Sequence, residues 1–405
     1  MNKIKLYRIE SNIPNEARKN ENDNFINEIN MYLLEDNIEL SIDVKVSYLN
    51  AVLVESGGSE EKFLKLVDKL TSPVILLEMG KHNSLAATFE IKTYLTNNTK
   101  IFPIHLSGNA DIIAKNLKEI HSIFYAKEQL KGCKLGVIGK PSDWLIASTV
   151  DYKKVLEKFG VELIDIDYDE FKLEIDKKEY EYVKEYDELL EKVDDPLKLE
   201  DALYVYGALK RLVNQYSLSG LTVRCFDLLD LYKTTSCLGL ALLNKQGIIA
   251  GCEGDIPALL TMLVSQKLSG LSSFQANPSY IFVEKGQVLF AHCTLPLDMC
   301  SSYKLDTHFE SDLSIGIKGE FPVDKVCVLK LSPDLKTYFA AEADVISSPN
   351  IEGYCRSQMI LQFDRNSYFK FVSENFGNHF VITYANVVHT FMTLIEFLYQ
   401  EIEEK

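Results

Sequence analysis

The chain has 405 residues, which at roughly 150 residues per domain predicts two or three domains, and we expect three. Hydrophobic residues make up 46% and charged residues 25% of the sequence, so the chain can bury real cores and is not of the disordered class. It carries 43 basic and 59 acidic residues, and the net charge of -16 argues against binding to nucleic acid or to anionic membranes.

We expect a cytoplasmic protein. The N-terminal sequence MNKIKLYRIESNIPNEARKNENDN lacks the apolar segment of a signal peptide, and no later stretch approaches the length of a transmembrane helix. The eight cysteines form no C-x-x-C pair, so we interpret most of them as buried, reduced thiols.

The first part of the chain alternates short apolar runs with amphipathic segments, the pattern of a parallel sheet with crossover helices. It predicts an N-terminal α/β domain over residues 1–130. Its expected strands include 51–54, 74–78 and 101–105, and its expected helices are 83–95 and 111–130.

A second open-sheet, Rossmann-like α/β domain is predicted over residues 131–272. It begins with the run KLGVIGKPSDW, continues with a helix over 152–159, and later has the strand GIIAGCEGD before an apolar helix over 257–268. The charged stretch 165–201 is interpreted as a surface insertion with solvated helices, interrupted at the Asp-Asp-Pro sequence 194–196.

Short β-rich runs separated by Gly, Pro, Ser and Asp fill residues 273–405, where we predict a β-rich, barrel-like domain closed by a helix from about Val387 to Glu403.

Glu253 and Asp255 are the first candidate site residues. They follow a buried-looking strand and precede a helix with Pro257 near its start, and ligands of open α/β sheets bind beyond the carboxyl ends of strands. Asp255 has an alternative role as the cap of that helix, whereas Glu253 lies too early in the chain to cap it.

Asn277, His292 and His379 are polar residues in apolar, β-rich surroundings. A single histidine in such a position is more often a hydrogen-bonded core residue than a metal ligand. Together with Glu253, however, the three make a mixed oxygen and nitrogen set that suits manganese, iron or zinc.

Motifs for nucleotide and hydrolase chemistry are missing. The run GVIGKPS does not have P-loop spacing, no G-x-G-x-x-G follows a predicted strand, and there is no G-x-S-x-G elbow.

The segment from about Thr222 to His292 resembles the fucose isomerase and arabinose isomerase superfamily. In that superfamily an E-x-D turn delivers a metal-binding glutamate, here Glu253-Gly254-Asp255, into an apolar helix that ends in L-x-G, here LSG. A second carboxylate follows in a strand of the form FADV, where this chain has FQAN with Asn277, 24 residues after Glu253 (277 minus 253). The sequences AHCTLP and GNHFVITYAN resemble the segments that carry the family's metal histidines.

The resemblance implies an aldose-ketose isomerase that works through an enediol, with a divalent metal, most often Mn²⁺, holding the sugar. Glu253 would be a metal ligand and proton-transfer group, His292 and His379 would be ligands, and Asp255 would be a reserve carboxylate. Asn277 departs from the family, because an amide can ligate a metal but cannot move a proton.

The resemblance extends to loops of short, fucose-isomerase-like proteins, here KHNSLAATFE and GKPSDWLIAS. Arg224, Asn83 and Trp144 are the candidate contacts to the sugar. By analogy we also expect a homo-oligomer, a trimer or hexamer, with loops near 82–84 and 142–144 reaching a shared site.

Two other functions stay open. The first is a different enzyme on the same scaffold, an epimerase or a lyase, and the second is a catalytically inactive sugar-binding homologue.

Overall fold

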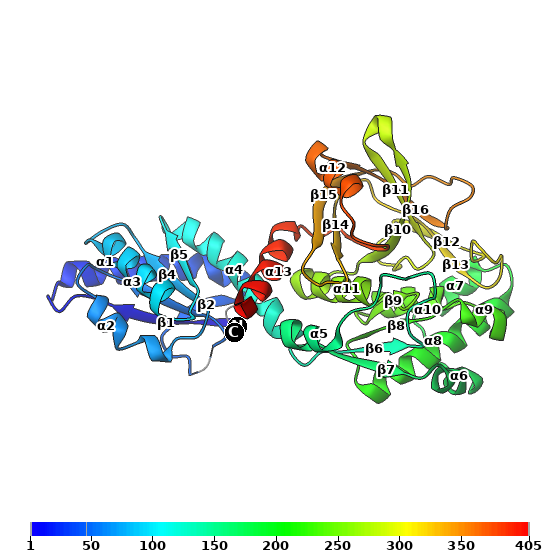
Figure 1. Ribbon diagram of the computed structural model, residues 1–405, viewed down its shortest axis with the longest axis horizontal. Helices are drawn as coiled ribbons and strands as arrows, with labels where there is room; N and C mark the ends of the chain where they lie inside the picture. Colours follow the sequence, from blue (N-terminus) through cyan, green and yellow to red (C-terminus); the bar gives the residue numbers. More distant parts are fainter. Residues whose placement is uncertain (1, 46, 404–405) are drawn as a thin grey trace. The chain divides into compact units, whose positions relative to one another are not determined.

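The computed structural model describes residues 2–45 and 47–403, which fold into two compact units, residues 2–128 and 129–403 (Figure 1). Within these residues, no helix combines the length and the apolar character needed to cross a bilayer.

The first unit is a five-stranded parallel sheet of order β2-β1-β3-β4-β5 with helices between its strands (Figure 1). Strands β3 and β4 are buried along their whole length, which explains why they are continuous apolar runs in the sequence. The elements are β1 (Asn2–Ile9), α1 (Glu16–Leu33), η1 (Leu34–Asp36), β2 (Ile38–Ser41), β3 (Asn50–Val54), α2 (Glu60–Leu64), η2 (Val67–Lys69), β4 (Val74–Glu78), α3 (Ser84–Asn98), β5 (Pro103–Ser107) and α4 (Ala110–Leu130).

The second unit begins with a four-stranded parallel sheet of order β7-β6-β8-β9. Strand β9 ends at Cys252, so the carboxyl edge of this sheet leads directly into Glu253. The elements are β6 (Lys134–Ile138), α5 (Tyr152–Phe159), β7 (Glu162–Ile166), α6 (Tyr168–Asp176), α7 (Tyr186–Lys192), α8 (Pro196–Tyr216), β8 (Gly220–Val223), α9 (Asp227–Tyr232), α10 (Cys237–Lys245), β9 (Ile249–Cys252) and α11 (Ile256–Ser269).

A closed antiparallel barrel of order β10-β11-β16-β15-β14-β17 follows in the same unit, beside a two-stranded sheet of β12 and β13. The elements are β10 (Phe274–Phe282), η3 (Val283–Lys285), β11 (Gln287–His292), β12 (Ser302–Asp306), β13 (Gly316–Glu320), β14 (Lys325–Leu331), β15 (Tyr338–Ser347), β16 (Ser357–Phe363), α12 (Arg365–Ser373), β17 (Phe380–Thr383) and α13 (Val388–Glu403). The chain is thus mixed α/β, with parallel sheets and a closed barrel, in broad agreement with the predicted fold class.

One hydrophobic cluster runs from the second parallel sheet into the barrel. It includes Ile138 and Val223 of the sheet together with Phe290 and Val328 of the barrel. Because the two layers share buried apolar surface, strand ends from both can be held at fixed positions relative to one another. The predicted domain limits, 1–130, 131–272 and 273–405, stay a prediction.

The charged stretch 165–201 is not the surface insertion predicted from its composition. Phe171 and Ile175 on α6 and Leu189 on α7 are buried in the core cluster of the second unit. Their spacing places them on the inner faces of helices whose outer faces carry the charges. Asp195 caps α8 and Pro196 lies at its start, as the Asp-Asp-Pro sequence indicated.

A substitution at Gly207 would test how tightly the segment 165–201 packs against α8. A Cβ atom at Gly207 in α8 would overlap the carbonyl oxygen of Glu179 and crowd Tyr180. We expect Gly207→Ala to lower the free energy of unfolding by about 1–3 kcal/mol despite the better helix propensity of alanine. Urea denaturation measures this, with Asn214→Ala at an exposed position of the same helix as the control. Equal stability of the two variants would contradict the close packing.

Candidate metal centre

Glu253 sits in a tight turn between β9 and α11. Its backbone has a φ of 64° and that of Gly254 a φ of 73°, so two successive residues are in the left-handed region. Gly254 is required, because a side chain there would collide with the carbonyl oxygen of Lys140. The Ser142 N–H donates to the Glu253 carbonyl at 2.9 Å, and Glu253 is only 7% exposed.

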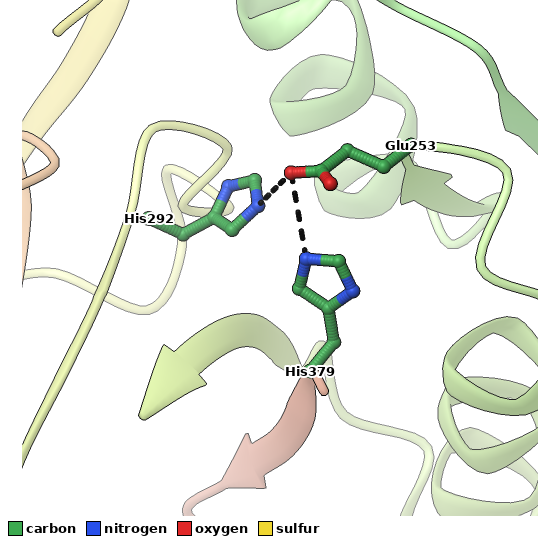
Figure 2. A group of neighbouring side chains, drawn as sticks. All are labelled: Glu253, His292 and His379. Carbon is green, nitrogen blue, oxygen red and sulfur yellow. Dashed lines mark ion pairs between the residues drawn. The ribbon is translucent and has the colours of Figure 1, made fainter. Parts of the chain in front are cut away.

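Two barrel strands bring histidines to this carboxylate (Figure 2). His292 is the last residue of β11, and His379 directly precedes β17 with a φ of 57°. The Nε2 atoms of His292 and His379 lie 3.7 and 3.5 Å from the same Glu253 oxygen, Oε1. The structure therefore brings together three of the predicted metal ligands from the sheet and the barrel.

The arrangement fits a metal ion. Glu253, His292 and His379 are all buried and offer ligand atoms within 4.8 Å of one another. Neither Nε2 atom has a hydrogen-bond partner among the described residues, which is costly for buried polar atoms. Donors about 2.1 Å from one ion at tetrahedral angles are about 3.4 Å apart, close to the separations seen here. A shared cation would satisfy both nitrogens and the carboxylate.

Asp255 supports this site from behind. One oxygen accepts the Ala258 N–H at 2.8 Å and caps α11, and the other accepts from His379 Nδ1 at 2.9 Å. Lys330 of β14, 1% exposed, lies 3.7 Å from that second oxygen and donates to the Asn378 carbonyl at 2.6 Å. Because Asp255 holds the Nδ1–H of His379, the Nε2 of that ring is turned toward Glu253.

These contacts shift the pKa values of the buried groups. Burial opposes ionisation of Glu253, but the neighbouring His292 and His379 outweigh it and hold the pKa of that carboxyl well below its usual range. For His379, burial favours the neutral ring, yet Asp255 and Glu253 raise its pKa to about 9. Burial also lowers the pKa of Lys330, against the attraction of Asp255. The site thus holds the Glu253 carboxylate ionised, and without a metal ion it favours the protonated ring of His379.

Asn277 lies on β10 and lines the same space as Glu253 and His292. Its Oδ1 accepts a hydrogen bond of 2.8 Å from Nδ2 of Asn378. One lone pair of the amide oxygen is therefore occupied, and one remains for a ligand. The position of Asn277 is compatible with the predicted ligand role, which stays a prediction.

The predicted sugar contacts lie in different places. Trp144, 52% exposed, donates from Nε1 to Glu253 Oε2 at 2.7 Å and meets Phe226 edge to face. Arg224 is held by Asp143 at 2.8 and 2.7 Å and by Asp227, so its contacts favour positioning of the loop that carries Trp144. Asn83 is an exposed residue before α3 in the first unit.

Two spaces adjoin the carboxylate and share lining residues. An inner cavity of about 30 Å³ is lined by Glu253, His292, Asn277 and five cysteines, and this volume suits an ion or a water molecule. An open cleft of about 550 Å³ is lined by Trp144, Glu253, Asn277 and their neighbours, in the size range of small-molecule sites. All eight cysteines are free thiols, and the Sγ atoms of Cys225 and Cys252 in the inner wall are 3.1 Å apart.

Similar proteins are sugar isomerases by name. No family model matches the chain. It is 26% identical over 245 residues to a sulfoquinovose isomerase of Alkalicoccus urumqiensis, covering 56% of this chain and 55% of that protein. It is 22% identical over 269 residues to one of Priestia megaterium (62% and 60%), and 31% identical over 114 residues to one of a Clostridium species (28% and 25%). The chain therefore spans little more than half the length of the first relatives. The likeness supports the isomerase superfamily without showing a specific family.

Three site residues were not predicted from the sequence. His308 and Glu310 line the inner cavity from the loop between β12 and β13, a polar stretch without strand or helix periodicity. Lys330 had a signal, because a lysine inside the apolar run KVCVLKL must find a buried partner. That partner is Asp255.

Asp255→Asn should weaken metal binding although it replaces none of the proposed ligands. Loss of the anion removes the group that holds His379 Nδ1 and leaves Lys330 without its counter-charge. We expect the affinity for Mn²⁺ to fall by about 10- to 100-fold, measured by titration calorimetry. Asp344→Asn at an exposed position of β15 is the matched control. Native-like affinity of the Asp255 variant would contradict the supporting role.

Proposed function

We propose that this protein is a metal-dependent aldose-ketose isomerase that acts on a small sugar. The observation that carries the proposal is the pair of buried Nε2 atoms of His292 and His379, which have no hydrogen-bond partner among the described residues. Both face one oxygen of Glu253, a residue that lines an open cleft. The likeness to proteins named sugar isomerases supports the same reaction class.

Glu253, His292 and His379 would hold the metal, with Asn277 as a neutral oxygen ligand. A mixed set of carboxylate, amide and imidazole suits Mn²⁺, and a bound divalent ion would polarise the sugar carbonyl and make the proton on the adjacent carbon more acidic. The chain's own residues would then bind the sugar, keep water away and move that proton through an enediol.

Trp144 would form one wall of the sugar site. Its indole is fixed by the hydrogen bond to Glu253 and by the Phe226 ring, so a flat apolar surface stands beside the carboxylate. Aromatic faces of this kind pack against the C–H surface of a sugar ring and exclude water at low entropic cost. The Arg224–Asp143 pair would keep the loop in place.

The charge of the cleft favours a neutral sugar. Sulfoquinovose carries a sulfonate, and an anion of this kind is usually held by Arg or Lys. The described residues that line the inner cavity and the cleft include two carboxylates, Glu253 and Glu310, and no Arg or Lys. We therefore propose that a neutral aldose is preferred over a sulfonated one. We also propose that the protein is a homo-oligomer, and light scattering would measure the mass of the assembly. We propose a cytoplasmic location as well.

Isotope exchange tests the reaction. Native protein with Mn²⁺ is incubated with a panel of neutral aldoses and with sulfoquinovose in deuterated water. We expect deuterium to enter the carbon next to the carbonyl as ketose appears, and removal of metal by a chelator to stop both.

Glu253→Gln should lower kcat by at least about 100-fold, because it removes the anionic ligand. Glu284→Gln at an exposed turn is the control. Exchange with an epimeric aldose as product would favour the epimerase alternative. Sugar binding without exchange would favour the inactive homologue and contradict our proposal.

A further inference from the structure

The proposed reaction needs a carboxylate that is free to move a proton, and Glu253 is poorly placed for it. Its Oε1 faces His292 and His379, and its Oε2 accepts the indole hydrogen of Trp144. Asn277, at the position where the resembled family has its second carboxylate, is an amide that carries no exchangeable acid proton near neutral pH. Asp255 is fully buried behind His379 and caps a helix.

Glu310 is the remaining carboxylate at this site. Among the described residues that line the inner cavity and the cleft, it is the one acid besides Glu253, and it lines both spaces. It lies on the loop that joins β12 to β13 and is exposed at the cleft, so a bound sugar can reach it. No hydrogen bond from a described residue engages its carboxylate, in contrast to Glu253 and Asp255.

The loop that carries Glu310 is anchored at both ends. Arg356, which precedes β16, donates from Nε to the Thr307 carbonyl at 2.7 Å. His308 exchanges backbone hydrogen bonds with Leu313 and Asp312, both 2.9 Å long, and its ring packs edge to face on Phe226. Glu310 is therefore presented by a closed turn beside the aromatic residues of the cleft, a requirement for a group that must meet a substrate atom.

We propose that Glu310 is the catalytic residue that transfers the proton between the two carbons of the sugar, in place of the carboxylate missing at Asn277. This inference rests on the proposed isomerase function and adds a residue and a role to it. Partial burial raises the pKa of the Glu310 carboxyl, which makes its carboxylate a better proton acceptor.

The proton transfers balance without any further reactant. The Glu310 carboxylate takes the proton from C2 of the aldose, the C2–H electrons form the C1=C2 bond, and the carbonyl electrons pass to O1, which takes the proton of the O2 hydroxyl. The electrons left on O2 then form C2=O, and the C1=C2 electrons take the proton from Glu310 onto C1. Two hydrogens have moved, from C2 and O2 to C1 and O1, and Glu310 returns to its ionised state.

The test compares native protein with Glu310→Gln, with the double variant Asn277→Asp/Glu310→Gln, and with the control Glu284→Gln. Each is measured for isomerisation and for deuterium uptake with Mn²⁺ and the aldose that the native protein accepts, and for Mn²⁺ affinity by calorimetry. We expect Glu310→Gln to lower kcat and exchange at least about 100-fold, the usual contribution of a general acid or base. Its Mn²⁺ affinity should stay within about threefold, since Glu310 is not a ligand.

The double variant tests whether the loss in Glu310→Gln is the loss of a proton-transferring carboxylate. It restores a carboxylate at position 277, so part of the lost exchange should return, at least about tenfold over Glu310→Gln alone. A Glu310→Gln variant that keeps native kcat while the native protein isomerises would overturn this inference and leave the proposed function intact. A native protein that neither isomerises nor exchanges any aldose would overturn both.

Discussion

A single carboxylate oxygen shared by two imidazole nitrogens organises this protein. Oε1 of Glu253 comes from the carboxyl edge of a parallel sheet. The Nε2 atom of His292 comes from the end of barrel strand β11, and that of His379 from the residue before barrel strand β17. Only a continuous core under both layers can hold three such atoms within a few ångströms, and the hydrophobic cluster provides it. The backbone takes on the strain, since Glu253 and His379 both adopt positive φ, which costs of order 1–3 kcal/mol for each non-glycine residue.

Asp255 links this centre to the rest of the fold. The same carboxylate caps α11, orients His379 and faces the buried Lys330, so a helix start, a candidate metal ligand and a barrel strand depend on one side chain. A buried ion pair of this kind is weak evidence for stability, because desolvation offsets the attraction. Its value lies in orientation, since it leaves one nitrogen of His379 with no hydrogen-bond partner among the described residues and aimed at Glu253.

The parts of the site that have a local pattern can be predicted from the sequence. Glu253 and Asp255 follow an apolar strand and precede an apolar helix, and the turn between them is visible as Glu-Gly-Asp. Lys330 was overlooked, although its apolar neighbours mark it as buried. Glu310 had no such pattern, because its loop reaches the cleft through contacts far apart in sequence, such as that of Arg356 with Thr307. The prediction of a surface insertion after residue 165 was wrong for a different reason. The segment has many charged residues, and its few apolar residues at helical spacing are the ones that are buried.

This chain has an amide, Asn277, where the resembled family has a carboxylate. In our proposal this separates two tasks that one acid on a strand would combine, metal binding and proton transfer. An anionic ligand neutralises a metal ion, and the cation in turn lowers the pKa of that ligand, so it is a weaker base than a carboxylate that binds no metal. With a neutral amide at 277, which accepts a hydrogen bond from Asn378, Glu253 would be the one anionic ligand of the proposed centre. A proton acceptor that is not itself a ligand keeps more of its basicity, and Glu310 lines the cleft without belonging to the proposed ligand set. On this proposal the centre binds its metal with less negative charge, and the loop between β12 and β13 supplies the base.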